Sequence, residues 1–492
     1  MGTSNYGATE TDLPQYPDLF GTQETPKFAD QAPTLTVSSV LHSRNPLVRS
    51  AELKARRKVQ FWNLIQTGLA YMFLLSSVQT ALSIGTLVLN SVDDEKFHGT
   101  STIGYTVLGV TYCVLAVAFW LSQPVVANIG PVNSMIISAD IILLVCFILF
   151  LVVFIRPLMV LIFIAAIVAG FGSAVLSTAG GVFMALNSDS ETIGRNTGIF
   201  YGLYETSLVW GNVGFFLIMS GSVEISTKQR YLIFAFLLSL AVFGTILVLL
   251  LKRRQAASVL QPSEFARAID RNFWDSMKAA IMLTQDPNVL YMTPLVIYLG
   301  LSSAFRNDIY NSSIGYTDRF RSLALVGMAG VFLGLGELTG SAICGAVSSK
   351  FPYMNRGKIV IGGVTFSVIA YIFIYLNLPS EANLGPTDGV SIISPPSKFV
   401  AVLCSFLMGI GDASINTQIY ALLAEMFGRD IVPPVGLFQS VYAVFCAVAY
   451  FYSTSLKLYA QMLILIVLSV AGCSSFTIMA GRFARSRHFE DL

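Results

Sequence analysis

Twelve long apolar stretches constrain this chain more than any other feature of its sequence. Each is close to or longer than the roughly 20 residues that a helix needs to cross a bilayer. Of the 492 residues, 54% are hydrophobic and only 12% are charged, whereas about 25% are charged in a typical soluble domain. The sequence therefore predicts an all-α polytopic membrane protein with twelve transmembrane helices. The predicted spans are residues 61–89, 102–121, 132–154, 158–186, 198–220, 231–251, 291–310, 322–348, 359–378, 399–424, 432–456 and 458–483.

The longest loop between spans divides them into two sets of six. A short internal echo supports this division, because Gly170-Phe171-Gly172 in the fourth span resembles Gly409-Ile410-Gly411 in the tenth, as expected for parallel repeats. Within the loop, apolar residues recur every fourth position and predict an amphipathic helix, lying on the inner leaflet or packed on the bundle. The predicted parts are a disordered cytoplasmic tail (1–57), an N-terminal half (58–251), a cytoplasmic linker (252–290), a C-terminal half (291–483) and a cytoplasmic tail (484–492).

Orientation follows from the basic residues of the loops and tails. With the N-terminus inside, 21 Lys and Arg residues fall on the cytoplasmic side and eight on the other side. Both termini are therefore predicted to be cytoplasmic, and the first span is expected to act as the insertion signal. The membrane itself is left open between the plasma membrane and an endolysosomal one.

Several classes of function are excluded at this stage. The basic residues are spread over loops, so nucleic-acid binding is not expected. All six cysteines fall inside predicted spans without metal-ligand spacing, and all three histidines lie outside the spans, so neither a metal site nor a histidine proton relay is expected. No nucleophile elbow or phosphate loop is present, and no cofactor or enzyme activity is predicted.

Charged side chains inside the predicted spans are the main candidates for a functional site. Each costs at least roughly 2.5 kcal/mol to insert, so each needs a partner or a wet cavity. Asp140 stands apart in the third span, whereas the others lie in the fifth, seventh, eighth and tenth spans. The predicted solute path consists of Asp412, Asn416, Gln418, Glu337, Glu205, Arg306 and Asp308.

Two alternatives remain open for these polar residues. Asp412, Asn416 and Tyr420 are spaced by four and share a helix face, where they would either line a cavity or form hydrogen bonds between helices. Glu337 would titrate or would pair with Arg306. Glu205 would line the path or reach the inner interface.

Short motifs outside the spans suggest further sites. Asn187, Asp189 and Arg195 join the fourth and fifth spans and are predicted to form a cytoplasmic gate or clasp. Asn311 begins an N-glycosylation sequon on the predicted exterior side, and Tyr16 with Leu19 fits a tyrosine-based sorting signal.

Three stretches resemble the Unc-ninety-three-like branch of the major facilitator superfamily, and within it the subgroup called major facilitator superfamily domain-containing protein eleven. They are the segment from Asn187 to Phe200, the Gly334-Leu335-Gly336-Glu337 segment with Gly340, and the segment from Gly411 to Gln418. The resemblance covers nearly all of the chain after its tail and implies the major facilitator fold. The uncharged segment 122–130 departs from the gating signature of typical major facilitators.

Two functions follow as hypotheses. The first is a transporter of a small solute that works by alternating access, with membrane lipid as its surroundings. The second, implied by the resemblance, is a non-transporting regulatory subunit of a potassium channel or a trafficking partner of another membrane protein. Fold analogy does not choose between them.

Overall fold

The computed structural model describes residues 46–91, 102–155, 159–188, 193–255, 278, 281–350, 356–427 and 432–490. Apart from one isolated β-bridge between Thr317 and Thr387, these residues form helices, turns and irregular segments, which confirms the all-α prediction. The helices are α2 (Pro46–Asn90), α3 (Thr102–Ile129), α4 (Pro131–Ile155), α5 (Met159–Leu186), α6 (Ile193–Glu205), α7 (Ser207–Met219), α8 (Thr227–Gln255), α11 (Pro287–Ala304), η2 (Phe305–Ile309), α12 (Tyr310–Tyr316), η3 (Asp318–Phe320), α13 (Ala324–Lys350), α14 (Arg356–Asn377), α15 (Lys398–Phe427), α16 (Val432–Ser453) and α17 (Leu458–Glu490).

Eleven helices in the described part of the chain are long and apolar enough to cross a membrane. The predicted fifth span is missing from this set because Thr206 divides it into α6 and α7, of 13 residues each. At 1.5 Å per residue, each covers only about 20 Å. The predicted count of twelve single spanning helices is therefore not confirmed.

Local sequence sets several helix ends. The Asp286 side chain accepts a hydrogen bond of 2.7 Å from the Asn288 backbone N–H, and Pro287 follows at the first helical position of α11, where its missing N–H costs nothing. Gly130 joins α3 to α4 with a φ of +85°, a conformation that glycine adopts without a Cβ clash.

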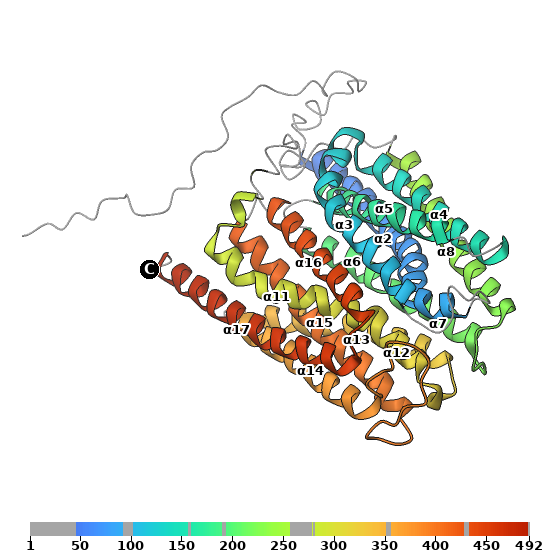
Figure 1. Cartoon of the computed structure of the whole chain (residues 1–492). Coiled ribbons are helices and arrows are strands. Elements are labelled where there is room, and N and C mark those ends of the chain that lie inside the picture. Colours follow the sequence, from blue (N-terminus) through green and yellow to red (C-terminus); the bar gives the residue numbers. More distant parts are fainter. Residues whose placement is uncertain are drawn as a thin grey trace, which may run out of the picture. The chain divides into compact units, whose positions relative to one another are not determined.

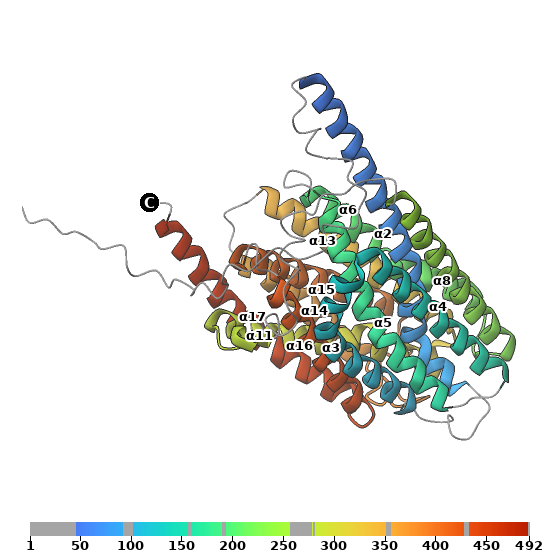
Figure 2. The same ribbon diagram turned by 90° about the horizontal axis from the view of Figure 1, so that it is seen from above.

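The helices pack as two sets, here called the N-terminal half (α2–α8) and the C-terminal half (α11–α17). In the first, α5 packs between α3 and α4, and α4 contacts α8; in the second, α15 packs between α13 and α14, and α11 contacts α16 and α17. The main helix pairs that join the halves are α3 with α16 and α7 with α13. Both views show α4 and α8 at one edge of the bundle and α17 at the other (Figures 1 and 2).

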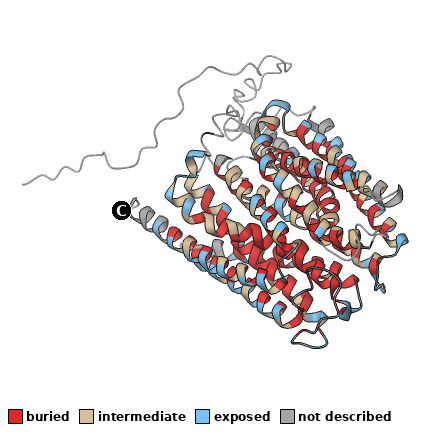
Figure 3. Ribbon diagram, in the orientation of Figure 1, coloured by how far each residue is buried: buried red, intermediate tan, exposed pale blue. Residues whose placement is uncertain are grey.

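Burial follows this arrangement (Figure 3). In an apolar stretch of 18 residues taken from each helix, 67% of the α15 stretch is buried, compared with 39% of the α4 stretch. Helix α15 is therefore central, and α4 faces the surroundings of the bundle. Large aromatic side chains such as Phe305, Tyr310 and Tyr371 are fully buried beside α11 and α15. The interior of the C-terminal half is thus both aromatic and polar.

Residues 58–492 form one compact unit. The division into two six-helix domains stays a prediction, as do the cytoplasmic tails. The tail sorting signal at Tyr16 and Leu19, and most of the amphipathic pattern of the linker, lie outside the described residues.

Candidate functional site

Three charged side chains from three helices of the C-terminal half meet inside the bundle. The Arg306 Nη2 atom lies 2.8 Å from Asp412 Oδ2, and Arg306 Nε lies 3.6 Å from Glu337 Oε1. Their side chains are at most 9% exposed. Glu337 and Asp412 lie near the middle of α13 and α15, so the pairing that the sequence left open for Glu337 is present deep in the bundle.

Glu205 adds a fourth member from the N-terminal half. Its half-buried carboxyl group lies close to Glu337, Asp412 and Arg306 and interacts electrostatically with all three. Glu205 therefore faces the other three charges, which favours the alternative in which it lines the solute path. Arg306, Glu337, Asp412 and Glu205 are together called the charge cluster.

The backbone is irregular at two of these charges. Arg306 lies in the π-helical segment η2, between α11 and α12, and Glu205 is the last residue of α6 before the interruption at Thr206. π-Helical segments occur frequently at functional sites, and interrupted membrane helices often mark binding sites in transporters. The sequence pattern shows neither irregularity, because no proline or glycine occupies these positions.

Asp308 has a partner of its own. The Tyr450 hydroxyl on α16 donates a hydrogen bond to Asp308 Oδ2. The centre of the Tyr112 ring on α3 lies 5.3 Å from the centre of the Tyr450 ring. Asp308 and Arg306 thus point to different partners, as their spacing predicts. Asp308 lies near the α3–α16 contact between the halves.

The remaining predicted path residues divide into two groups. The Asn416 side chain interacts with the Asp412 carboxyl group, and it lies beside the cluster on the helix face that the spacing of four residues predicts. Gln418 does not, because its Oε1 atom accepts a hydrogen bond of 3.2 Å from Arg356 Nη1. Arg356 also forms an ion pair with Glu425, which sequence reasoning missed. Gln418 is thus part of an α14–α15 contact, two residues and slightly more than half a helical turn away from Asn416.

The two ends of the interface between the halves differ in packing. The α12–α13 end is the end where α12 leads into α13, and the α15–α16 end is where α15 leads into α16. At the α12–α13 end, the Asn311 side chain donates a bond of 2.8 Å to Ser83 Oγ, and Tyr316 donates one of 3.2 Å to the Thr86 carbonyl. The N-terminal and C-terminal halves are therefore hydrogen-bonded to each other at this end.

The α15–α16 end is more open between α6 and α13. Nothing lies within 4 Å of a Cβ built on Gly198 or Gly202 of α6, or on Gly345 of α13. Tyr201 and Tyr420, from opposite halves, interact with each other and with Glu205, yet they are 44% and 37% exposed. The neighbourhood of Glu205 is therefore less tightly packed at the α15–α16 end.

Two of the three residues of the predicted clasp, Asn187 and Arg195, lie among the described residues. Asn187 is fully buried, where its Oδ1 atom accepts a bond of 3.2 Å from Asn63 and its carbonyl accepts one of 3.2 Å from Asn196. Arg195 lies with its guanidinium carbon 5.6 Å from the centre of the Phe61 ring. Asp189 lies outside the described residues, so its ion pair with Arg195 stays a prediction.

The predicted end of the seventh span at Tyr310 is wrong. Helix α12 runs on to Tyr316, and Asn311 is only 2% exposed inside it. The Asn311 amide nitrogen is occupied by bonds to Ser83 and to the Asn307 carbonyl. This packing leaves no room for a glycan on Asn311.

Asp140 lies on the outer face of α4, halfway along its apolar span. It is exposed together with Ile137, Leu144 and Phe147, which are 44–49% exposed. Within the described part of the chain, no hydrogen bond or ion pair to Asp140 is found. Its carboxyl group thus lies on a face that is otherwise suited to lipid.

The chemistry of the charge cluster follows from its unequal charges. One arginine faces Asp412, Glu337 and Glu205, so it cannot neutralise all three carboxylates, and burial of unpaired charge is costly. The buried Arg306 Nη1 atom also lacks a hydrogen-bond partner among the described residues. The cluster can therefore accept protons or a cationic group on its acids and an acceptor oxygen on Arg306. Among the described residues, no group of three or more His, Cys, Asp or Glu side chains suits a metal ion.

Comparison with known proteins places these features in a family context. The profile of a family described as "Ion channel regulatory protein UNC-93" matches residues 97–477. The chain is 31% identical over 450 residues to "UNC93-like protein MFSD11" of Xenopus tropicalis, covering 87% of this chain and 98% of the relative. The MFSD11 protein of Xenopus laevis is also 31% identical, over 84% of this chain and 94% of its own.

More distant similarities agree with these matches. "UNC93-like protein 3" of Arabidopsis thaliana is 22% identical over 79% of this chain and 81% of its own. A crystal structure of the nucleoside transporter NupG superposes with a TM-score of 0.57 at 15% identity, covering 85% of this chain and 99% of NupG. At this identity the structural similarity concerns the fold alone, and it confirms the major facilitator fold.

Proposed function

Since this chain belongs to the UNC-93 family and is a transporter-like, multi-pass membrane protein of the major facilitator fold, we propose that it moves a small polar solute by alternating access, coupled to protons. The observation that carries this proposal is the contact between Glu205 and Glu337. These two acids come from opposite halves, and they meet beside the ion-paired Arg306 and Asp412. A chemical event at this contact therefore acts on the relative position of the halves.

Protons act on this contact through charge. Two ionised carboxylates in contact repel each other, whereas one shared proton turns the repulsion into a hydrogen bond. Protonation would hold α6 against α13 and close the α15–α16 end, and release of the proton would open it. This is a two-state element that both proton and solute bias.

The solute class follows from the groups that lack partners. Arg306 Nη1 offers a buried donor, while Glu205 and the half-buried Asn416 face the accessible side. A small solute with an acceptor oxygen and a hydrogen-bond-donating or cationic group fits these residues, as the midplane sites of transporters do in general. The same proposal places both termini and the α15–α16 end in the cytoplasm, which the excess of basic residues supports.

The test is proton flux in proteoliposomes that contain a pH-sensitive dye. Small amines, amino acids and polyols would be added one at a time to the reconstituted protein. We expect at least one solute to drive proton movement, Asp412→Asn to abolish it, and the exposed Asp318→Asn outside the spans to leave it unchanged. If active solutes drove equal flux through Asp412→Asn, or no solute in any class did so, this function would be wrong.

A second candidate function is favoured by Asp140. An unpaired carboxylate on a lipid-facing helix is costly, and a basic residue in the membrane helix of another protein would compensate for it. This is the arrangement that a regulatory subunit of a channel or another membrane protein would use. Asp140→Asn would then abolish co-purification of a membrane partner while solute-driven proton flux persists; an unchanged partner in this variant would remove Asp140 from the interface.

A further inference from the structure

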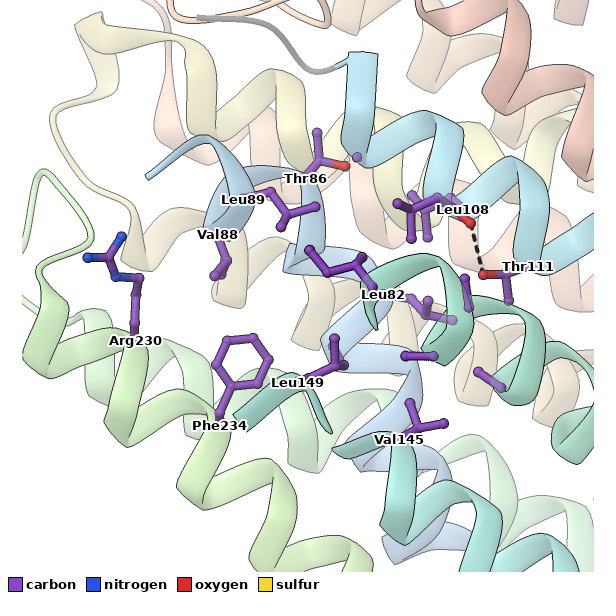
Figure 4. A pocket seen from close by; sticks show the side chains of 18 residues that line it. Leu82, Thr86, Val88, Leu89, Leu108, Thr111, Val145, Leu149, Arg230 and Phe234 are labelled. Atoms are coloured by element: carbon purple, nitrogen blue, oxygen red, sulfur yellow. Dashed lines mark hydrogen bonds between the residues drawn. The ribbon is translucent and has the colours of Figure 1, made fainter. Parts of the chain in front are cut away.

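A cavity lies within the N-terminal half, apart from the charge cluster. It has a volume of about 130 Å³, is partly open, and is lined by residues of α2, α3, α4, α5 and α8 (Figure 4). Its wall is made of aliphatic and small side chains, including Leu82, Leu108, Val145 and Ala166. An engineered apolar cavity of about 150 Å³ binds benzene, so this space is suited to part of a single hydrocarbon chain.

One wall of the cavity is open because a side chain is absent. Nothing lies within 4 Å of a Cβ built on Gly85 of α2, whereas a Cβ on Gly68 of the same helix would lie 2.7 Å from the Leu203 side chain. At Gly104, in contrast, a Cβ would lie 2.7 Å from the Thr86 Oγ1 atom. The space is therefore local to Gly85 and does not reflect loose packing between α2 and α3.

Polar groups lie at defined places in this apolar wall. Arg230, in the first turn of α8, is 7% exposed and places a permanent positive charge at one end of the cavity, as Figure 4 shows. Arg230 Nη2 donates a bond of 2.9 Å to Thr227 Oγ1, and Arg230 Nη1 donates to the Ser91 carbonyl. These contacts fix the guanidinium at the α12–α13 end of the half, in the first turn of the candidate membrane span that begins at Thr227.

Thr86 supplies the second polar observation. It lines the cavity and is 2% exposed, yet its hydroxyl has no hydrogen-bond partner among the described residues. Thr111, the other threonine of the wall, is bonded to the Val107 carbonyl at 2.9 Å. Because buried hydroxyls are normally hydrogen-bonded, Thr86 points to a ligand with a polar group.

We propose that this cavity binds a single-chain anionic amphiphile, a fatty carboxylate, with its chain against Gly85 and its head group toward Arg230. A basic group beside an apolar space between membrane helices is the arrangement that recognises acidic lipids. The volume has room for part of one chain and not for two. All residues that line the cavity belong to the N-terminal half, and none of them belongs to the charge cluster.

The test uses a tryptophan placed in the wall. Phe234 lines the cavity one turn from Arg230, and Phe234→Trp in lipid nanodiscs would report contact with a bromine-labelled fatty acid through fluorescence quenching. The parental chain supplies the background of its four native tryptophans. We expect saturable quenching, with the acid binding about tenfold more tightly than its methyl ester, because hydrogen bonds to charged groups are the stronger ones.

Three further variants on the Phe234→Trp background separate the contributions. Gly85→Leu places a side chain in the space that is open around the Gly85 Cβ position, and it should abolish saturable quenching in a folded protein. Arg230→Gln should remove the preference for the acid while the ester still binds, and Arg230→Lys should keep that preference. Equal quenching before and after Gly85→Leu, or equal binding of acid and ester by the parent, would overturn the proposal. Tighter binding of a brominated phospholipid than of the acid would overturn the choice of a single-chain ligand.

Discussion

Glycines of α13 lie at both ends of the interface between the halves, but their packing differs. Near the α12–α13 end, a Cβ built on Gly327 would lie 2.7 Å from the Phe216 backbone nitrogen, so α13 touches α7 directly. Near the other end of the same helix, Gly345 has open space. Small residues let membrane helices approach closely, but only the first glycine is used in this way. Helix α13 is thus tightly packed against α7 near one end and has open space near the other.

The charge cluster lies between these two ends. Glu337 is ten residues beyond Gly327 and eight before Gly345 along α13, and its contact with Glu205 is where the packed part of the interface gives way to the open part. Whatever changes this contact should therefore change the open end more than the closed one.

The largest effect is expected from Arg306→Gln, which removes the cation between the two ends. Loss of one partner of a buried ion pair typically costs about 3–5 kcal/mol, so we expect a marked drop in the unfolding temperature in detergent. Glu337 and Asp412 would then be buried without an arginine. The double variant with Asp412→Asn should recover part of this loss, and no recovery would show that Arg306 acts only through its packing.

An intermediate effect is expected from alanine at the two contrasted glycines. Gly327→Ala should destabilise the protein by about 1–3 kcal/mol, because the Phe216 backbone cannot yield to a Cβ. Gly345→Ala is the matched control and should be neutral or stabilising by up to about 1 kcal/mol from helix propensity. Thermal unfolding of both variants measures the difference, and equal effects would contradict the distinction between the ends.

A smaller effect is expected from Tyr316→Phe at the closed end. The Tyr316 hydroxyl donates to the Thr86 carbonyl across the halves, and a typical hydrogen bond contributes about 0.5–1.5 kcal/mol. The variant should increase thiol labelling of a cysteine placed at Ser83, which is 3% exposed. Tyr459→Phe, whose hydroxyl bonds within the C-terminal half, should leave the labelling unchanged.

The sequence predicted most of the fold because apolar length alone identifies a membrane helix. It missed the interruption at Thr206 and the π-helical segment around Arg306, since neither leaves a proline or glycine signal. It grouped Asp412 with Asn416 correctly, because helical spacing decides which residues share a face. It misplaced Gln418 and did not find the Tyr450 partner of Asp308, because contacts between distant helices depend on packing that periodicity does not encode.

The most direct test of the account measures distances at both ends of the interface in nanodiscs. Spin labels on Gly198 and Gly345 would report the open end, and labels on Ser222 and Leu323, whose backbones are bonded across the halves at 3.2 Å, would report the closed end. Cys113, the exposed native cysteine among the described residues, would be replaced by serine. We predict that acidification brings Gly198 and Gly345 together and separates Ser222 from Leu323, and that Glu205→Gln fixes the acidic distances at every pH. One unchanging distance at each end, in both proteins and at every pH, would contradict proton-coupled alternating access.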